Sequence, residues 1–311
     1  MDVLSDVVAV TRTGRPRSAH VRWHAPWGQE FAPVPGAAGF QVVLQGSCWL
    51  TRPAEEPVRL GQGDVVFLAH GSGHTLADSP ESLAAPAACD PDDHELYGAY
   101  TSARVDRSGD GGPVTVVLCG AYELDPARTH PLLLTLPDLI HLPADPDRHP
   151  ELCSAMTLLA AELETPRLGA DAAVPALLDT LLLYILRIWF REQRDREDVT
   201  GWAAALNDPP VTAALHAIHQ DPAAPWTVAK LAAEAGLSRA PFARRFAALV
   251  GQPPLGYLTW WRMTTAARLL RTTDAPLRTI ATQVGYTSEF AFANAFKRTH
   301  GNPPGRYRRG N

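Results

Sequence analysis

Long apolar runs, a secretion signal and paired cysteines are all missing from this 311-residue chain. No uninterrupted run approaches the roughly 18 apolar residues of a membrane span, and the first residues lack the basic and then apolar pattern of a secretory leader. The 4 cysteines lie far apart without a CxxC pair, which favours neither a disulfide framework nor a cysteine zinc site. We therefore expect a cytoplasmic protein with reduced thiols and no membrane partner.

Signatures of common enzymes are missing as well. The chain has no GxGxxG or GKS/T phosphate-binding motif, and no arrangement of serine, histidine and aspartate that would indicate nucleophilic catalysis. The simplest expectation is that the protein is not an enzyme.

The net charge of −5 hides a segregation of charge along the chain. Between Trp226 and Asn311, 13 basic and 3 acidic side chains give +10, which leaves −15 for the remainder. A basic end on an acidic body indicates a polyanionic partner for that end alone.

Apolar periodicity separates a β-rich part from a helical part and predicts an α+β protein. Short apolar segments between Gly, Pro and Asp fill residues 1–142, and residues 80–113 are predicted to be a long loop or insertion between strands. From about residue 150 onward, apolar residues recur at helical spacing. We expect a β-barrel domain at 1–145, linking and dimerising helices at 146–204 and an all-α domain at 205–311.

The segment 174–190 is unusually apolar. A helix that is apolar on so many sides should be buried on more than one of them. It is therefore either a core helix or an element that packs between domains or against a second subunit of a homodimer.

A weak internal repeat marks the basic end. WTVAKLAAEAGLSRAPFARRFAALVG and APLRTIATQVGYTSEFAFANAFKRTHG align with an offset of 49 up to the glycine and 50 after it. Each copy predicts a helix-turn-helix unit, in which glycine makes the turn and Ser238, or Thr287 or Ser288, caps the second helix. That helix would bury a phenylalanine pair at i and i+4 and present its other face to a DNA major groove.

Between the copies, LGYLTWWRMTTAARLLRTTDAP has apolar residues at helical spacing. We expect one long helix that joins the two units rigidly. If both second helices enter one face of duplex DNA, they should lie roughly 34 Å apart, one helical turn.

This end of the chain resembles the DNA-binding domain of AraC/XylS-type transcription regulators. The resemblance covers residues 210–309 and is carried by LAAEAGLSRAPFARRF, YLTWWRMTTAARLL and IATQVGYTSEFAFANAFKRTHGNPPGRYR. It implies a sequence-specific transcription regulator whose partner is double-stranded DNA, with RNA polymerase as a further candidate partner and a dimer as the common assembly.

The resemblance also implies which side chains meet DNA. The implied base contacts are Ala240, Ala243, Arg244, Glu289, Phe290, Ala291 and Asn294. The implied phosphate contacts are Arg239, Arg245, Lys297 and Arg298. Arg244 is the long polar side chain of the first recognition helix and the candidate for a guanine edge, whereas Asn294 favours adenine.

The β-rich half resembles the cupin-type sensor domain of one branch of this family. GDVVFLAHGSGH matches the second cupin motif through His74, although Ala69 replaces its proline. The first motif departs from H-x-H because His20 and His24 are four residues apart. These three histidines are expected to line an effector pocket and form the candidate set for a metal, the alternative being a structural His74 hydrogen-bonded inside the barrel.

Cysteine-based redox sensing is another hypothesis for this domain. Relatives in the same branch include regulators that respond to oxidants through cysteines. Cys119 occupies the strand position of a sensing cysteine, and Cys89 in the predicted loop would be the more accessible thiol. An apolar strand disfavours Cys119 in this role, because buried thiols are usually inert.

Three functions thus remain open for the β-rich half. In the first, it binds a small effector or senses stress and shifts the population of DNA-competent chains. In the second, it is a metal-dependent cupin enzyme with an accessory DNA-binding tail. In the third, it is only a dimerisation module.

Overall fold

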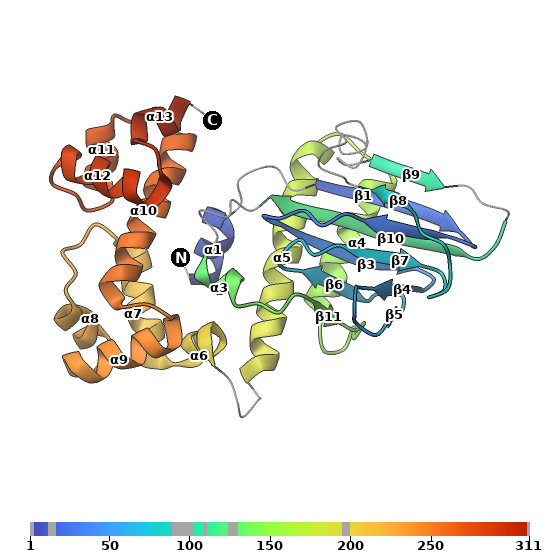
Figure 1. The fold of residues 1–311 in the computed structure, drawn as a ribbon, viewed down its shortest axis with the longest axis horizontal. Coiled ribbons are helices and arrows are strands. Elements are labelled where there is room, and N and C mark those ends of the chain that lie inside the picture. The colour runs from blue at the N-terminus through green and yellow to red at the C-terminus, as the bar shows by residue number, and fades with distance from the viewer. Residues whose placement is uncertain are drawn as a thin grey trace. The chain divides into compact units, whose positions relative to one another are not determined.

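The computed structural model describes residues 3–11, 17–88, 103–107, 111–123, 130–194 and 200–309 (Figure 1). The chain divides into two units by its internal contacts. The β unit comprises Arg12–Thr129 and Leu136–Trp189. The helical unit comprises Met1–Thr11, His130–Thr135 and Phe190–Asn311.

The strands of the β unit form two sheets. They are β1 Arg17–His24, β2 Gly28–Phe31, β3 Ala37–Gln45, β4 Cys48–Thr51, β5 Val58–Leu60, β6 Val65–Leu68, β7 His74–Ala77, β8 Ala85–Ala88, β9 Ala103–Arg107, β10 Val114–Glu123 and β11 Ile140–Leu142. The six-stranded sheet has the order β11-β6-β3-β10-β1-β9, and the five-stranded sheet has the order β5-β4-β7-β2-β8. The expected barrel is therefore built as a sandwich.

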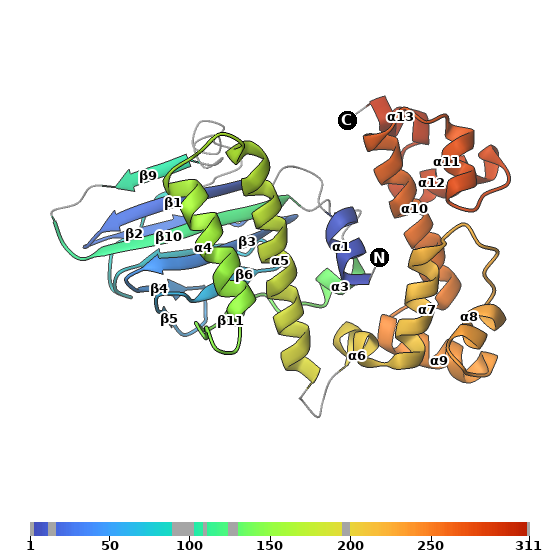
Figure 2. The ribbon, with the colours of Figure 1, turned by 180° about the vertical axis from the view of Figure 1, so that it is seen from behind.

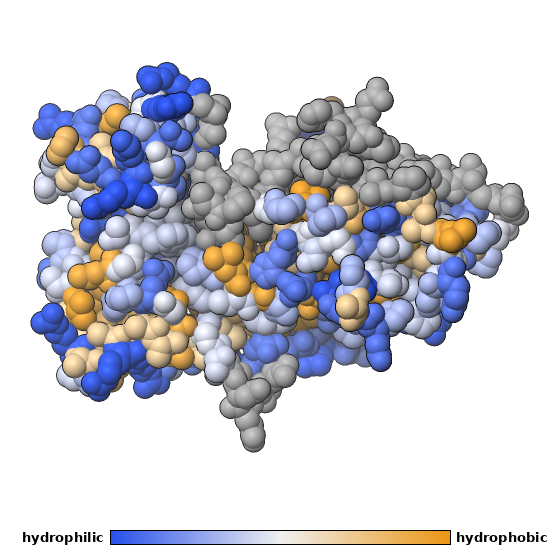
Figure 3. Space-filling view, viewed as in Figure 1, coloured by the Kyte–Doolittle hydropathy of each residue, from blue (hydrophilic) through white to orange (hydrophobic). Residues whose placement is uncertain are grey.

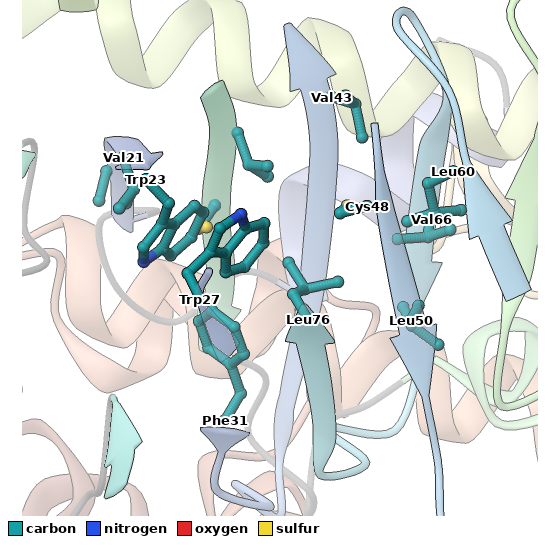
Figure 4. Close-up of a cluster of buried hydrophobic side chains, with 13 residues drawn as sticks. Val21, Trp23, Trp27, Phe31, Val43, Cys48, Leu50, Leu60, Val66 and Leu76 are labelled. Atoms are coloured by element: carbon teal, nitrogen blue, oxygen red, sulfur yellow. The ribbon is translucent and has the colours of Figure 1, made fainter. Parts of the chain in front are cut away.

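Apolar side chains from both sheets meet between them. Trp23 and Trp27 stack at 4.4 Å between ring centroids, close to Phe31 (Figure 4). The other members of this core are Ala19, Val21, Val43, Cys48, Leu50, Leu60, Val66, Leu76, Val117 and Cys119. Because successive residues of a strand point to opposite faces, the core places His20, Arg22 and His24 of β1 on the outer face of the sheet.

Two helices, α4 (Pro150–Glu164) and α5 (Ala170–Arg194), cover the outer face of the six-stranded sheet (Figure 2). This arrangement explains why β10 is apolar on both faces. Val117 belongs to the core between the sheets, and Val116 and Leu118, which are also buried, point toward the helix-covered face.

Helix α5 is the one helix among the described residues that is long and apolar enough to cross a membrane, with a mean hydropathy of 1.7 over its most apolar window. The protein itself buries 44% of that window, and Leu178, Leu181, Ile185 and Leu186 are fully buried. The core role predicted for residues 174–190 is therefore confirmed for these side chains.

The loop predicted for residues 80–113 was wrong for two segments. β8 pairs in parallel with β2, and β9 pairs in parallel with β1, so each forms the edge of a sheet. The sequences of β8 (APAA) and β9 (ARVDR) contain one β-branched residue and no aromatic residue, so they lack the composition that marks a strand. Residues 89–102 and 108–110 of the predicted loop lie outside the described residues.

The helical unit contains both predicted helix-turn-helix units. Its helices are α1 Val3–Thr11, α3 Pro131–Leu134, α6 Gly201–Asn207, α7 Pro209–Gln220, α8 Val228–Glu234, α9 Arg239–Val250, α10 Pro254–Thr272, α11 Leu277–Gln283, α12 Glu289–His300 and α13 Pro304–Arg309. α8 and α11 begin 49 residues apart, and α9 and α12 begin 50 apart. The repeat and the long connecting helix are thus confirmed, with the extra residue in the second turn.

The two recognition helices, α9 and α12, begin differently. Ser288 caps α12 by accepting the Ala291 N–H at 3.3 Å. Ser238 precedes α9 but makes no such hydrogen bond, so its predicted capping role was wrong. The residue equivalent to Ala291 is Pro241, which has no N–H to donate.

A buried chain of hydrogen bonds ties α1 and the start of α3 into the helical unit. Asp6 Oδ2 lies 3.0 Å from His219 Nδ1, the His219 Nε2 lies 2.6 Å from the Tyr257 hydroxyl, and that hydroxyl lies 3.0 Å from His130 Nε2. Because His130 Nδ1 accepts the Leu132 N–H, one assignment of protons satisfies all groups: His130 donates to Tyr257, Tyr257 to His219, and His219 to Asp6.

This assignment requires a neutral His130 and a neutral Tyr257. Burial, together with the nearby His219, lowers the pKa of His130 well below its ordinary value. Burial and the Asp6 carboxylate raise the pKa of Tyr257 well above its ordinary value. Both pKa shifts keep His130 and Tyr257 neutral, as the assigned arrangement of protons requires.

Replacing Tyr257 with phenylalanine tests this chain of hydrogen bonds. Tyr257→Phe keeps the ring but leaves two buried histidine nitrogens without their partner, which should lower the free energy of unfolding by about 1–3 kcal/mol. Urea denaturation measures the change, with Tyr184→Phe, at a half-buried site in α5, as the control. Equal stability of the wild type and Tyr257→Phe would contradict the assignment.

Candidate nucleic-acid interface

Helix α9 buries one face and exposes the other. Phe242, Phe246 and Val250 point into the helical unit and are buried. The predicted base contacts Ala240 and Arg244 lie on the exposed side, and Ala243 is half-buried beside them. The predicted phosphate contact Arg239, at the start of α9, is also exposed.

Helix α12 repeats this arrangement. Phe292, Ala295 and Phe296 are buried in the core that α10 and α11 share with α12. The exposed predicted contacts of α12 are Glu289, Phe290, Ala291, Asn294, Lys297 and Arg298. Hydrophilic side chains dominate the surface over α11, α12 and α13 (Figure 3). Against that background Phe290 stands out, because 77% of this aromatic residue is exposed.

Arg245 is engaged within the protein. Its Nε donates to Asp208 Oδ2 at 2.6 Å, and the same carboxylate caps α7 by accepting the Val211 N–H at 3.0 Å. Asp208 is buried, whereas about half of the Arg245 side chain is exposed. A buried carboxylate needs its cationic partner, so Arg245 has a structural role that the sequence did not reveal. Its phosphate contact stays a prediction.

Each helix-turn-helix unit has one exposed basic residue on its first helix that was not predicted to contact DNA. Lys230 lies in α8, whose first turn is capped by Thr227 Oγ1 accepting the Lys230 N–H at 3.2 Å. Arg278 lies in the first turn of α11. First helices of such units cross the DNA backbone, so both residues are candidates for phosphate contacts. Both residues lie outside the recognition helices, for which the resemblance implied contacts.

Among the described residues of the β unit, two cavities have a volume of about 530 Å³ each, a size typical of small-molecule sites. One lies between the outer face of the six-stranded sheet and α4, and His20, Arg22, Val42, Met156 and Ala160 line it among others. The other is lined by Phe31, Arg52, Glu55, His74 and Asp138 among others.

The predicted set of three histidines is not brought together. His20 and His74 line different cavities, and His24 lies with His20 on the outer face of β1. Among the described residues, no group of three histidine, cysteine, aspartate or glutamate side chains is placed to hold a metal. The candidate metal site at His20, His24 and His74 was therefore wrong, because strand alternation points His20 and His24 to the outer face of β1 whereas His74 stacks on Phe31 of the core.

His74 has a structural environment. Its Nε2 lies 3.1 Å from Gln41 Nε2, and its ring stacks on Phe31 with 4.7 Å between centroids. Burial lowers the pKa of His74 to about 4. The imidazole is therefore neutral near pH 7 and serves the packing between the sheets.

The sequence comparisons agree with this architecture. The cupin family model matches residues 2–191, and a helix-turn-helix domain model matches residues 231–310. A protein of Streptomyces lividans that carries the name of an AraC-like transcription regulator is 36% identical over 310 residues, which are 99% of this chain and 98% of its own. The chain belongs to the AraC-type transcription regulators.

Other proteins similar to this AraC-type regulator are also transcription regulators or parts of them. AlkR of Acinetobacter baylyi, a transcriptional regulator, is 27% identical over 99% of both chains. The solved DNA-binding domain of AdpA, in complex with a target DNA, is 35% identical and covers 33% of this chain and 92% of its own, with a TM-score of 0.32. The helix-turn-helix match and the AraC-like relative that spans 99% of this chain show that the protein is a DNA-binding transcription regulator. The named relatives give no support to the cupin-enzyme alternative.

Three cysteines lie in the part of the chain that the structure describes: Cys48 and Cys119 are buried, and Cys153 is half-buried. Cys119 is buried in the core between the sheets. Burial, with a further effect of Asp64, raises the pKa of Cys48 to about 12. Partial burial also raises the pKa of Cys153, and a raised pKa slows thiol chemistry. Cys89, the other candidate for redox sensing, lies outside the described residues.

The buried His74 predicts an acid-sensitive β unit. In the unfolded chain a histidine titrates near 6.5, whereas His74 titrates at about 4 when folded. The unfolded state takes up the proton first, so the stabilisation is present above about pH 6.5 and is lost as the pH falls toward about 4, by up to about 3 kcal/mol. Urea denaturation at about pH 7 and about pH 4.5 should therefore show a smaller pH effect in His74→Gln than in the wild type. Identical pH effects would contradict the assignment.

Proposed function

We propose that this regulator reads two neighbouring major-groove segments of one DNA duplex, the first with α9 and the second with α12. The observation that supports this is the exposure of the unburied face of both recognition helices in a segment of charge +10. Arg244 would donate to a guanine edge, Asn294 would pair with adenine, and Phe290 would pack on a thymine methyl group. Arg239, Lys297 and Arg298 would contact phosphates and fix the register.

The β unit is proposed to sense a small effector. The cavity beneath α4 supports this proposal, since its polar groups His20 and Arg22 converge with apolar side chains of the sheet and the helix. A ligand there would touch both layers of the β unit and so would favour particular positions of α4. We further propose that the protein forms a homodimer, contacts RNA polymerase and resides in the cytoplasm, where its DNA would be.

Removing Arg244 should abolish base discrimination at one position of the operator. In selection of binding sites from a random duplex library, Arg244→Ala should lose the preference for guanine at that position, a loss of about 1–3 kcal/mol. Preferences at the positions read by α12 should remain. An unchanged guanine preference in the variant would show that Arg244 does not read the base.

Removing Lys297 should act differently, because phosphates carry no sequence information. Lys297→Ala should weaken binding to specific and scrambled DNA by similar factors. It should also reduce the slope of log affinity against log salt concentration by about 1. A titration by fluorescence anisotropy across a salt series measures both, and a sequence-dependent loss would contradict the phosphate assignment.

A further inference from the structure

Arg262, in the middle of α10, binds the loop that leads into the first helix-turn-helix unit. Its Nε donates to the Pro222 carbonyl oxygen at 2.7 Å, and its Nη2 donates to the Ala224 carbonyl oxygen at 2.9 Å. Both carbonyls belong to the loop between α7 and α8. One guanidinium therefore holds two carbonyl groups of that loop against the connecting helix.

The same guanidinium also meets the second unit. It lies 5.9 Å from the centroid of the Tyr286 ring, within the range of a cation–π contact. Gly285, in the turn between α11 and α12, has a φ of +82°, and a Cβ there would lie 2.7 Å from Arg262 Nη2 and 2.9 Å from the Ala223 carbonyl oxygen. The turn of the second helix-turn-helix unit thus packs on the loop that precedes the first one, and the Arg262 guanidinium lies beside this contact.

Hydrogen bonds within the loop 221–226 hold the conformation that Arg262 binds. Asp221 Oδ1 accepts the N–H groups of Ala223 and Ala224 at 3.1 and 3.0 Å. The Trp226 indole N–H donates to the Asp221 carbonyl oxygen at 2.7 Å. We call Arg262, the loop 221–226 and the turn 285–286 the Arg262 bracket.

We propose that Arg262 is a positioning residue that sets the separation and rotation of α9 relative to α12, and so the spacing between the two base sets that the regulator accepts. The proposal rests on the proposed function, in which both helices read bases. One inserted base pair moves the second site by about 3.4 Å and turns it by about 35° about the DNA axis. Without the Arg262 guanidinium, the described connection between the two helix-turn-helix units rests on α10 and on the close approach of Gly285 to the Ala223 backbone. A helix without a brace at its middle bends and twists more easily than a braced one.

Site selection with the purified full-length protein tests the proposal. The wild type should select two base sets at one spacing, and insertion of one base pair between them should weaken binding about tenfold or more. Arg262→Met should select the same two base sets, but the insertion should weaken its binding only about threefold or less. Arg262→Lys keeps the charge but cannot reach both carbonyls and the ring in one geometry, so it should give an intermediate penalty.

Arg271→Met is the matched control. Arg271 lies on the same helix, is half-buried, and donates to the Tyr307 hydroxyl at 3.0 Å within the second unit. Its loss removes one guanidinium and one hydrogen bond but no connection between the units, so the spacing penalty should stay at the wild-type value. Thermal unfolding shows whether each variant is folded, and Arg262→Lys carries the test if Arg262→Met is not.

The outcomes separate this proposal from the proposed function. If folded Arg262 variants keep the wild-type penalty for the inserted base pair, the positioning role is overturned. If Arg271→Met relaxes the spacing as much as Arg262→Met, the effect is one of general stability and the proposal also fails. If the wild type selects no paired base sets, the proposed mode of DNA reading fails first.

Discussion

The pairing of two phenylalanines one helical turn apart fixes how α9 and α12 are each set in the helical unit. Phe242 and Phe246 in α9, and Phe292 and Phe296 in α12, are fully buried. An α-helix that buries residues i and i+4 has its rotation about its own axis fixed. The side chains on the opposite face are thereby exposed in a defined order. The core thus decides which residues each helix exposes, and in the proposed mode of DNA reading the exposed residues supply the contacts to bases and phosphates.

Much of the helical unit could be predicted because its determinants are local. Helical spacing, turn glycines and phenylalanine pairs are properties of short segments, and the one-residue insertion in the second turn was visible in the repeat itself. The absent cap at Ser238 shows the limit of this reasoning, since Pro241 stands where the donor should be. The ion pair between Arg245 and Asp208 was hidden because the two residues are 37 positions apart.

The β unit was harder to predict because its pattern is carried by pairing between distant strands. The motif around His74 and the histidines of β1 suggested one site, yet strand alternation points His20 outward while His74 packs against Phe31. Trp23 and Trp27 stack in the core between the sheets (Figure 4). The cavity that His20 lines lies on the outer face of the six-stranded sheet, beneath α4, and it is separate from the cavity that His74 lines. The effector proposal accordingly uses the helix-covered side of the six-stranded sheet, where His20 and Arg22 line one cavity, and not a pocket shared by all three histidines.

The hydrogen-bonded chain from His130 to Asp6 adds a constraint that no local pattern contains. α1 precedes the first strand, and α3 lies between β10 and β11 in the sequence, yet both belong to the helical unit. Their side chains converge on Tyr257 of α10 through His219 and His130. Tyr257 and Arg262 lie five residues apart on the same helix. The first half of α10 is therefore connected to α1 and α3 through Tyr257, and its middle joins the two helix-turn-helix units through Arg262. A change that alters α1 or α3 therefore acts on the one helix that also positions both recognition helices, without contacting either of them.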